Sequence, residues 1–320
     1  MKRLGPWAVT ITLLLFLSAP PVHGAPLEKG RVAYVANEHS GTISIIDGEA
    51  MQVAGTIAVS PGPHNLAFSP DGRLLLVTHP SADRLSLVDA IQQKVKAVLQ
   101  ISGRPHGVAV SSNGQTGYVA AEGLRKLLVI DLIVGKILKE VALQESPHNV
   151  ALTGDGRRIW VTSLGSHSIW LVDAVTSEVE RMPTYGAPHD LTLTARGQDA
   201  WVTNWGSSLL FHIETSSRLL TPVETSGRNP HHLAITPDGS EVWVSNHDSS
   251  NVSIIDARAK IELARVPVGR APHHVAISSN GQRAYVANHG SHDVTVIDVL
   301  TRRVIGTVAV GKGPHGVVAN

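Results

Sequence analysis

The 320-residue sequence contains no cysteine, and this absence excludes several chemistries at once. Without a thiol the chain forms no disulfide, attaches no c-type haem and carries no lipid on an N-terminal cysteine. Aromatic residues are scarce, at 4%, whereas glycine (29 residues) and proline (18 residues) are frequent. The hydrophobic fraction of 42% is well above that of a disordered chain. The composition therefore favours a folded, turn-rich β protein.

The sequence also lacks concentrated charge. Its formal net charge is +1, and no run of like charges exceeds a few residues. Proteins that bind nucleic acids or anionic membrane surfaces need a concentrated basic patch. We therefore expect no nucleic acid and no membrane surface among the partners of this protein.

The apolar stretch at the N-terminus is too short to span a bilayer as a helix. Lys2 and Arg3 form a positive start, residues 8–17 are mainly apolar, and residues 22–24 resemble a small-residue cleavage site. This order is typical of a secretory signal peptide. We predict a signal peptide over residues 1–24, cleavage after Gly24, and a periplasmic or secreted protein without a membrane span.

The dipeptide Pro-His occurs seven times at a nearly constant spacing. Successive histidines of these pairs are 42, 42, 41, 42, 42 and 42 residues apart. A period of 40–45 residues with four short strands per repeat is typical of a β-propeller blade. The histidines of the seven pairs are His64, His106, His148, His189, His231, His273 and His315.

Each repeat, aligned on its histidine, predicts four strands. An alternating strand follows Pro-His, and a turn with glycine at one position, such as Gly72, leads into a second strand. A loop rich in glycine and serine precedes a third strand, and a weaker fourth strand leads to the next Pro-His. The third strand ends in an acidic residue that we expect to cap a turn. These acidic residues are Asp47, Asp89, Asp131, Asp173, Glu214, Asp256 and Asp298.

The order of strands at the two ends of the chain predicts how the ring closes. After the signal peptide the chain begins with a second strand (residues 31–36) and ends with an inner strand (residues 315–319). Pairing these two strands completes one blade and removes open sheet edges. We therefore predict an all-β protein, a monomeric seven-bladed β-propeller over residues 25–320. Its blades start near residues 63, 105, 147, 188, 230, 272 and 314.

The second strand carries a recurrent motif, as in residues 34–37 (YVAN), 201–204 (WVTN), 243–246 (WVSN) and 285–288 (YVAN). Together with the Ser-Pro-Asp-Gly turn at residues 69–72, this motif resembles the YVTN family of seven-bladed propeller repeats. The resemblance covers the chain after the signal peptide. It implies an exported bacterial propeller, remotely similar to the haem d1 domain of cytochrome nitrite reductase, and it implies no particular activity.

Two interpretations of the seven repeat histidines remain open. In the first, the imidazoles converge on the central channel and bind a transition metal such as Cu, Zn, Ni or Fe, or a metal-containing cofactor. In the second, each histidine makes a structural hydrogen bond at its own blade junction. Its partner would then be a side chain fourteen or fifteen residues further on, or a backbone carbonyl where, as at Ala120 and Ala121, those positions carry no polar side chain. The candidate partners are Asn37, Asn204, Asn246, Asn288, Thr78 and Thr162.

Other loops at the same end of the ring contribute further candidates. Trp205 and Tyr185 could form aromatic platforms for a planar ligand. Further histidines are expected in these loops, at His39, His79, His167, His247, His289 and His292.

The sequence has no serine-nucleophile motif, no phosphate-binding glycine loop and no paired acids, so it marks no catalytic residue. We expect a binding protein for a metal or a metal-containing cofactor. One alternative is an interaction scaffold for a periplasmic or cell-surface protein. Another is a lyase-type enzyme that uses pairs such as His148 and Glu145.

Overall fold

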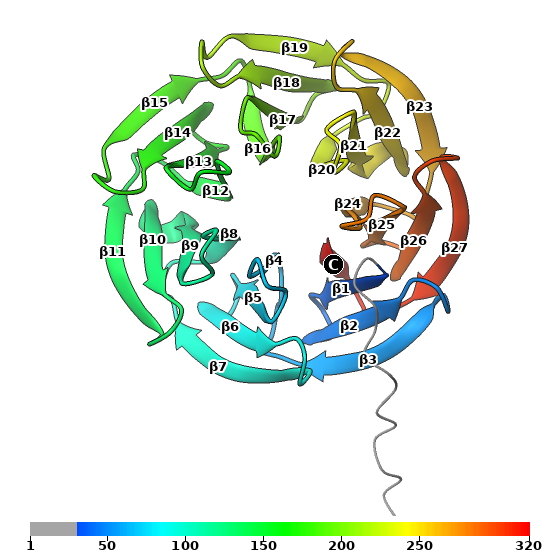
Figure 1. Cartoon of the computed structure of the whole chain (residues 1–320), viewed down its shortest axis with the longest axis horizontal. Helices are drawn as coiled ribbons and strands as arrows, with labels where there is room; N and C mark the ends of the chain where they lie inside the picture. Colours follow the sequence, from blue (N-terminus) through cyan, green and yellow to red (C-terminus); the bar gives the residue numbers. More distant parts are fainter. Residues whose placement is uncertain (1–30) are drawn as a thin grey trace, which may run out of the picture.

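The computed structural model describes residues 31–320, so the predicted signal peptide lies outside the described residues. Seven four-stranded antiparallel sheets form a ring around a central axis (Figure 1). This arrangement confirms the predicted all-β, seven-bladed propeller. Two short 3-10 helices, η1 (Glu122–Leu124) and η2 (His247–Ser249), lie in loops between second and third strands.

The strands fall into four classes by their position in the blade. The inner strands are β4 (Leu66–Phe68), β8 (Pro105–Val110), β12 (Pro147–Leu152), β16 (Ala187–Leu193), β20 (Pro230–Ile235), β24 (Pro272–Ile277) and β28 (Pro314–Ala319). The second strands are β1 (Val32–Asn37), β5 (Leu74–His79), β9 (Thr116–Ala121), β13 (Arg158–Ser163), β17 (Asp199–Trp205), β21 (Glu241–Asn246) and β25 (Arg283–Asn288).

The other two classes complete each blade toward the rim. The third strands are β2 (Thr42–Asp47), β6 (Arg84–Asp89), β10 (Lys126–Asp131), β14 (Ser168–Asp173), β18 (Leu209–Glu214), β22 (Asn251–Asp256) and β26 (Asp293–Asp298). The outer strands are β3 (Gln52–Ala58), β7 (Lys94–Gln100), β11 (Lys136–Ala142), β15 (Val179–Pro183), β19 (Leu220–Glu224), β23 (Ile261–Pro267) and β27 (Arg303–Ala309).

The hydrophobic core lies between neighbouring blades. The second and third strands are buried on both faces, because each sheet packs against a sheet on either side. The outer strand β7 instead alternates between exposed and half-buried residues. Trp160, Trp201 and Trp243 occupy the position of Tyr34 in their blades and are at most 3% exposed. These tryptophans are therefore packing residues.

The turn residues behave as the repeat predicts. Gly72 has φ +71°, and glycine takes the same left-handed conformation at this turn in the other five complete repeats. The side chain of Asp89 accepts hydrogen bonds from the backbone N–H groups of Ile91 (3.0 Å) and Gln92 (2.7 Å). This carboxylate therefore caps the turn after the third strand.

The ring closes through the two ends of the described chain. β28 pairs with β1 in the antiparallel sense, with Ala319 opposite Ala33 and Val317 opposite Val35. The C-terminus accordingly lies beside β1 (Figure 1). The predicted closure is confirmed. Within residues 31–320, no helix is long and apolar enough to cross a membrane.

Candidate functional site: a ring of seven histidines

The seven repeat histidines surround the channel axis as one closed ring of imidazoles, here called the histidine ring. The imidazole centroids of neighbouring blades lie 3.5 Å apart at the closest pair, His64 and His315. The widest neighbouring pairs, His231–His273 and His273–His315, are separated by 4.5 Å. The first and last repeat histidines are thus in contact. The structure therefore brings all seven predicted site histidines together.

In six of the seven blades, a β-bulge at the start of the inner strand turns the histidine toward the channel. In β12 the register places Pro147 opposite Ser163 and Val150 opposite Val161, so the inner strand has one residue more than its partner. The same shift occurs in β8, β16, β20, β24 and β28. A bulge of this kind redirects a side chain that would otherwise follow the alternation of the strand.

Three ring histidines bond to the neighbouring blade through Nδ1. Nδ1 of His106 lies 3.2 Å from the main-chain oxygen of His148, and Nδ1 of His148 lies 3.0 Å from that of His189. His189 makes the same contact with His231 at 2.9 Å. A carbonyl oxygen only accepts, so Nδ1 carries the proton in all three residues. Their Nε2 atoms consequently retain a free lone pair.

The other four ring histidines lack this bond. Their buried Nδ1 atoms have no hydrogen-bond partner in the part of the chain that the structure describes; they belong to His64, His231, His273 and His315. One ring nitrogen from each of His231, His273 and His315 lies within 4.8 Å of the other two. Tetrahedral ligands at about 2.0–2.1 Å from a metal are about 3.3 Å apart, so small side-chain rotations would bring these nitrogens into ligating positions.

The ring histidines are neutral at physiological pH. Burial lowers the pKa of His64 to about 4, that of His148 to about 3 and that of His273 to about 2. Burial also holds the pKa of the other four well below the usual range, and neighbouring imidazoles lower it further. A neutral imidazole is the form that binds a metal. The ring therefore presents unprotonated nitrogen atoms to the channel.

The proposed side-chain partners of the ring imidazoles bond elsewhere. The hydroxyl of Thr162 accepts from the backbone N–H of Asn149 (3.0 Å) and donates to the carbonyl of His189 (2.8 Å). The amide of Asn37 instead donates to Thr42 and Ser44 of its own sheet. The side-chain partners named in the structural interpretation are therefore wrong, whereas its other candidate, a backbone carbonyl, is the group that three ring imidazoles contact. The inter-blade bond is made by Nδ1 and a neighbouring carbonyl.

The loops above the ring bring some of the predicted residues close to it. The indole of Trp205 stacks on the imidazole of His189, with ring centres 5.1 Å apart. The imidazole of His289 stacks on that of His273, with ring centres 4.4 Å apart, and the ring centre of His247 lies 5.2 Å from that of His273. Trp205 thus forms part of the channel mouth.

Other candidates in these loops lie apart from the ring. Tyr185, predicted as a second aromatic platform, is 84% exposed in the connection before β16. His79 is fully buried and bonds to Pro61 and Ser86, which is a structural role. His167 lies exposed in the loop between β13 and β14.

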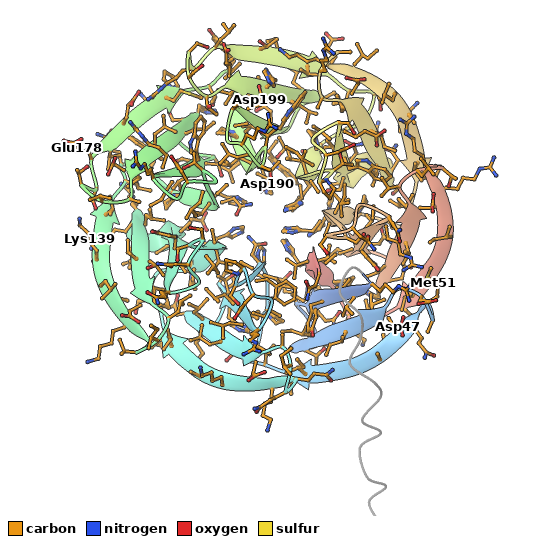
Figure 2. The ribbon with its side chains drawn as sticks, viewed as in Figure 1. Asp47, Met51, Lys139, Glu178, Asp190 and Asp199 are labelled. Carbon is orange, nitrogen blue, oxygen red and sulfur yellow. The ribbon has the colours of Figure 1, made fainter. Side chains whose placement is uncertain are left out.

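Below the ring, the residues that follow five of the seven histidines form a layer of polar side chains. Asp190 is only 2% exposed, and its carboxylate accepts from the backbone N–H of Leu233 (3.0 Å) and from the side chain of Asn149. His232 Nε2 lies 3.4 Å from the same carboxylate, and His232 stacks on His274 at 3.8 Å. Figure 2 shows Asp190 beside the channel, far from Lys139 at the rim.

This polar layer lines a cavity of about 440 Å³ whose other walls are apolar residues of the inner strands. Burial raises the pKa of Asp190, although the His232 imidazole opposes this shift. Asp190 was not among the site residues predicted from the sequence. The signal was present, because the residue after the repeat histidine is polar in five of seven repeats, namely Asn65, Asn149, Asp190, His232 and His274.

No protein-family model and no curated protein matches the chain, so the resemblance to YVTN repeats stays a prediction. Solved structures do match. Hydrazine synthase of Kuenenia stuttgartiensis aligns with a TM-score of 0.79 and 22% identity, over 84% of this chain and 93% of that chain. A functionally unknown protein of Desulfotomaculum acetoxidans aligns with a TM-score of 0.77 and 15% identity, over 90% of this chain and 98% of that chain.

A third structure, dihydro-heme d1 dehydrogenase NirN in complex with DHE, aligns with a TM-score of 0.69 and 16% identity. The match covers 95% of this chain and 78% of that chain. Identities this low carry the architecture only, since unrelated functions share the propeller fold. The comparisons therefore establish that the chain is similar in fold to known propellers.

Proposed function

We propose that the protein binds a transition-metal ion, or a cofactor that contains one, at the histidine ring. The observation that supports this most directly is the group formed by His231, His273 and His315, whose ring nitrogens lie within 4.8 Å of one another. Their Nδ1 atoms are buried without hydrogen-bond partners among residues 31–320. Unsatisfied buried polar atoms reduce stability, and a metal ion would satisfy them.

The remaining ring residues support the same function in another way. His106, His148 and His189 are held by backbone carbonyls, which orients their imidazoles and leaves Nε2 free of its proton. In histidines that bind a metal, a hydrogen bond at the ring nitrogen that does not contact the metal commonly fixes the orientation of the imidazole. Imidazole ligands suit Zn, Cu, Ni and Fe, and seven of them cannot all reach one ion. We assign coordination to His231, His273 and His315 and a supporting role to the others.

A structural role for part of the ring is the second candidate. The three Nδ1 bonds join neighbouring blades whether or not a metal binds, which fits a scaffold with structural histidines. The Nδ1 atoms of His231, His273 and His315, which have no partner among residues 31–320, favour metal binding over this alternative. The two named neighbours, hydrazine synthase and a dihydro-heme d1 dehydrogenase in complex with DHE, match in fold only, so the proposal rests on the histidines of this chain.

The test is metal binding to the purified protein and to single variants of the ring. Elemental analysis and calorimetric titration with Cu²⁺, Zn²⁺ and Ni²⁺ should detect a bound ion. Replacement of His231, His273 or His315 by Ala should weaken binding by about 10-fold or more. His167→Ala, in an exposed loop, is the matched control and should bind as the parent protein does. No binding by the parent, or equal binding by all four variants, would refute the proposal.

We further propose that the protein is exported, on the basis of residues 1–24. N-terminal sequencing of protein recovered from the periplasm or the medium of a bacterial host should begin at Ala25. Protein that stays in the cytoplasm with Met1 retained would contradict export.

A further inference from the structure

A second group of metal-binding side chains lies at the channel mouth, outside the histidine ring. Glu38 and His39 belong to the loop between β1 and β2, and His289 follows β25 in the neighbouring blade. One ligand atom of each lies within 4.8 Å of the other two. Glu38 Oε2 is 3.6 Å from His289 Nε2, and the imidazoles of His39 and His289 are 5.0 Å apart. We call Glu38, His39 and His289 the mouth triad.

Backbone hydrogen bonds hold the two loops of the mouth triad in place. The N–H of Glu38 donates to the carbonyl of Gly313 (2.8 Å), and that of His39 donates to Lys312 (3.1 Å). The N–H of His289 donates to the carbonyl of Ala271 (3.0 Å). The closure of the ring therefore positions Glu38 and His39, whereas His289 is held within its own blade, so little backbone movement is needed to use the three side chains together.

Gly313 lies beside the space between the two imidazoles. It has φ +65°, and a Cβ atom added there would lie 2.8 Å from Nδ1 of His39 and 3.2 Å from Nε2 of His289. The first distance is shorter than non-bonded atoms normally allow. Glycine at this position therefore leaves both nitrogens free to approach a common point.

The charge of the mouth triad suits a cation. The contact with His289 Nε2 holds the pKa of Glu38 below its usual range, and the nearby imidazoles of His64 and His39 act in the same direction. Glu38 is consequently an anion near neutral pH. Glu38 and His289 are half-buried and His39 is exposed, so solvent reaches the group. Water could therefore complete the coordination of a bound ion.

We propose that the mouth triad is a second metal site, which binds a divalent first-row transition-metal ion. Two imidazoles and one carboxylate match the ligands of Zn²⁺ and Fe²⁺ sites that keep open positions for water or substrate. Mg²⁺ and Ca²⁺ prefer oxygen ligands and do not fit this set. The inference goes beyond the proposed function, because none of the three ligands belongs to the histidine ring.

Binding at the mouth triad would also join two blades. Glu38 and His39 lie in the blade that contains the β28–β1 closure, whereas His289 lies in the adjacent blade. An ion held by both loops binds only the closed ring, so it stabilises that form by mass action. The melting temperature should therefore rise with metal concentration through this site.

Equivalent loops provide matched controls. Glu122 occupies the position of Glu38 in another blade and pairs with Arg104 at 3.3 Å. His167 is a loop histidine that, like His39, is exposed. Glu122→Gln and His167→Ala should therefore leave metal binding unchanged.

The experiment is calorimetric titration of the metal-free full protein with Zn²⁺, with Co²⁺ as a spectroscopic probe and Mg²⁺ as a negative control. Glu38→Gln and His39→Ala should each abolish one binding event or weaken it about 10-fold or more, and should remove the associated rise in melting temperature. The double variant His231→Ala/His315→Ala should retain this event. Gly313→Ala should weaken it, since the methyl group occupies the space between the imidazoles.

The outcomes separate this site from the histidine ring. The mouth triad is supported if Glu38→Gln abolishes Zn²⁺ binding while the double variant His231→Ala/His315→Ala retains it. This holds even if the histidine ring binds no metal. Zn²⁺ binding with unchanged stoichiometry and affinity in both Glu38→Gln and His39→Ala overturns the inference. Loss of binding in the control variants as well would also overturn it, because the effect would then not be specific to the three ligands.

Discussion

Nδ1 of His148 lies 3.0 Å from the main-chain carbonyl oxygen of His189, the equivalent histidine of the next blade. The bond joins a side chain of one blade to the backbone of its neighbour. It also places the imidazole proton on Nδ1 and leaves Nε2 with a lone pair. The same contact is present at His106 and His189 and missing at the other four positions of the ring within the described chain. Seven copies of one motif therefore have two different environments.

The first prediction concerns stability at these two kinds of position. His148→Ala should lower the free energy of unfolding by about 0.5–1.5 kcal/mol, because it removes an inter-blade hydrogen bond. His273→Ala should cost less or be slightly stabilising in metal-free protein, since its Nδ1 is buried and unpaired within residues 31–320. Urea denaturation of the metal-free variants measures the difference. An equal cost at both positions would show that the Nδ1 bond contributes nothing specific.

The second prediction concerns acid. In the unfolded chain these histidines take up a proton near pH 6.5. In the folded protein, burial lowers the pKa of His64 to about 4 and that of His148 to about 3. Between these values the unfolded state binds more protons, so the stability present above pH 6.5 is lost as the pH falls toward 4. Each such histidine contributes about 1.4 kcal/mol per pH unit at most.

Urea denaturation at pH 7.5, 6.5 and 5.5 tests this dependence. The free energy of unfolding should fall steeply below pH 6.5, and His148→Gln should reduce the slope because it removes one of the titrating groups. A free energy of unfolding that stays constant between pH 7.5 and 5.5 would contradict the neutral, buried state of the ring.

The third prediction concerns ring closure. Deletion of residues 313–320 removes β28, exposes the edge of β1 and takes Val317, which is 2% exposed, out of the core. An exposed strand edge promotes aggregation. The truncated protein should aggregate or melt at a much lower temperature, measured by light scattering and differential scanning calorimetry. His315→Ala, which keeps β28, is the control and should remain monomeric. A monomeric truncation with an unchanged melting temperature would refute this closure.

The fourth prediction concerns the buried carboxylate below the ring. Asp190→Ala leaves the backbone N–H of Leu233 without its acceptor and should lower the free energy of unfolding by about 1–3 kcal/mol. Asp190→Asn keeps an acceptor oxygen and should cost less. The exposed Asp248 serves as control, and its replacement by Ala should change stability by no more than about 0.5 kcal/mol. Equal effects of Asp190→Ala and Asp190→Asn in urea denaturation would contradict this role.

The architecture could be predicted from the sequence because it depends on local, repeated signals. Three local features recur along the repeats: glycine at the turn, alternation of apolar residues, and an acidic residue at the end of the third strand. Each of them specifies its own short segment. The strand order at the two ends predicted the pairing of β28 with β1, since a blade with an unpaired edge is unfavourable.

The site could be predicted only in part. The Pro-His pairs identified the seven histidines, but their inward direction depends on the bulge between residues such as Pro147 and Val150. A bulge is a property of the register between two strands. Trp205 was predicted at the channel mouth and stacks there on His189. Tyr185 was also predicted there, but its side chain is exposed to solvent in the connection before β16.

The number of blades and their arrangement in a ring follow from the sequence alone, because a period of about 42 residues repeats one supersecondary unit that must pack against its neighbours. Which imidazoles bond to a neighbouring carbonyl is visible only in the folded protein, since it depends on the position of the backbone of the next blade. The contact between Glu38 and His289 is likewise visible only in the folded protein, because these residues approach one another only after the first and last parts of the chain have closed the ring.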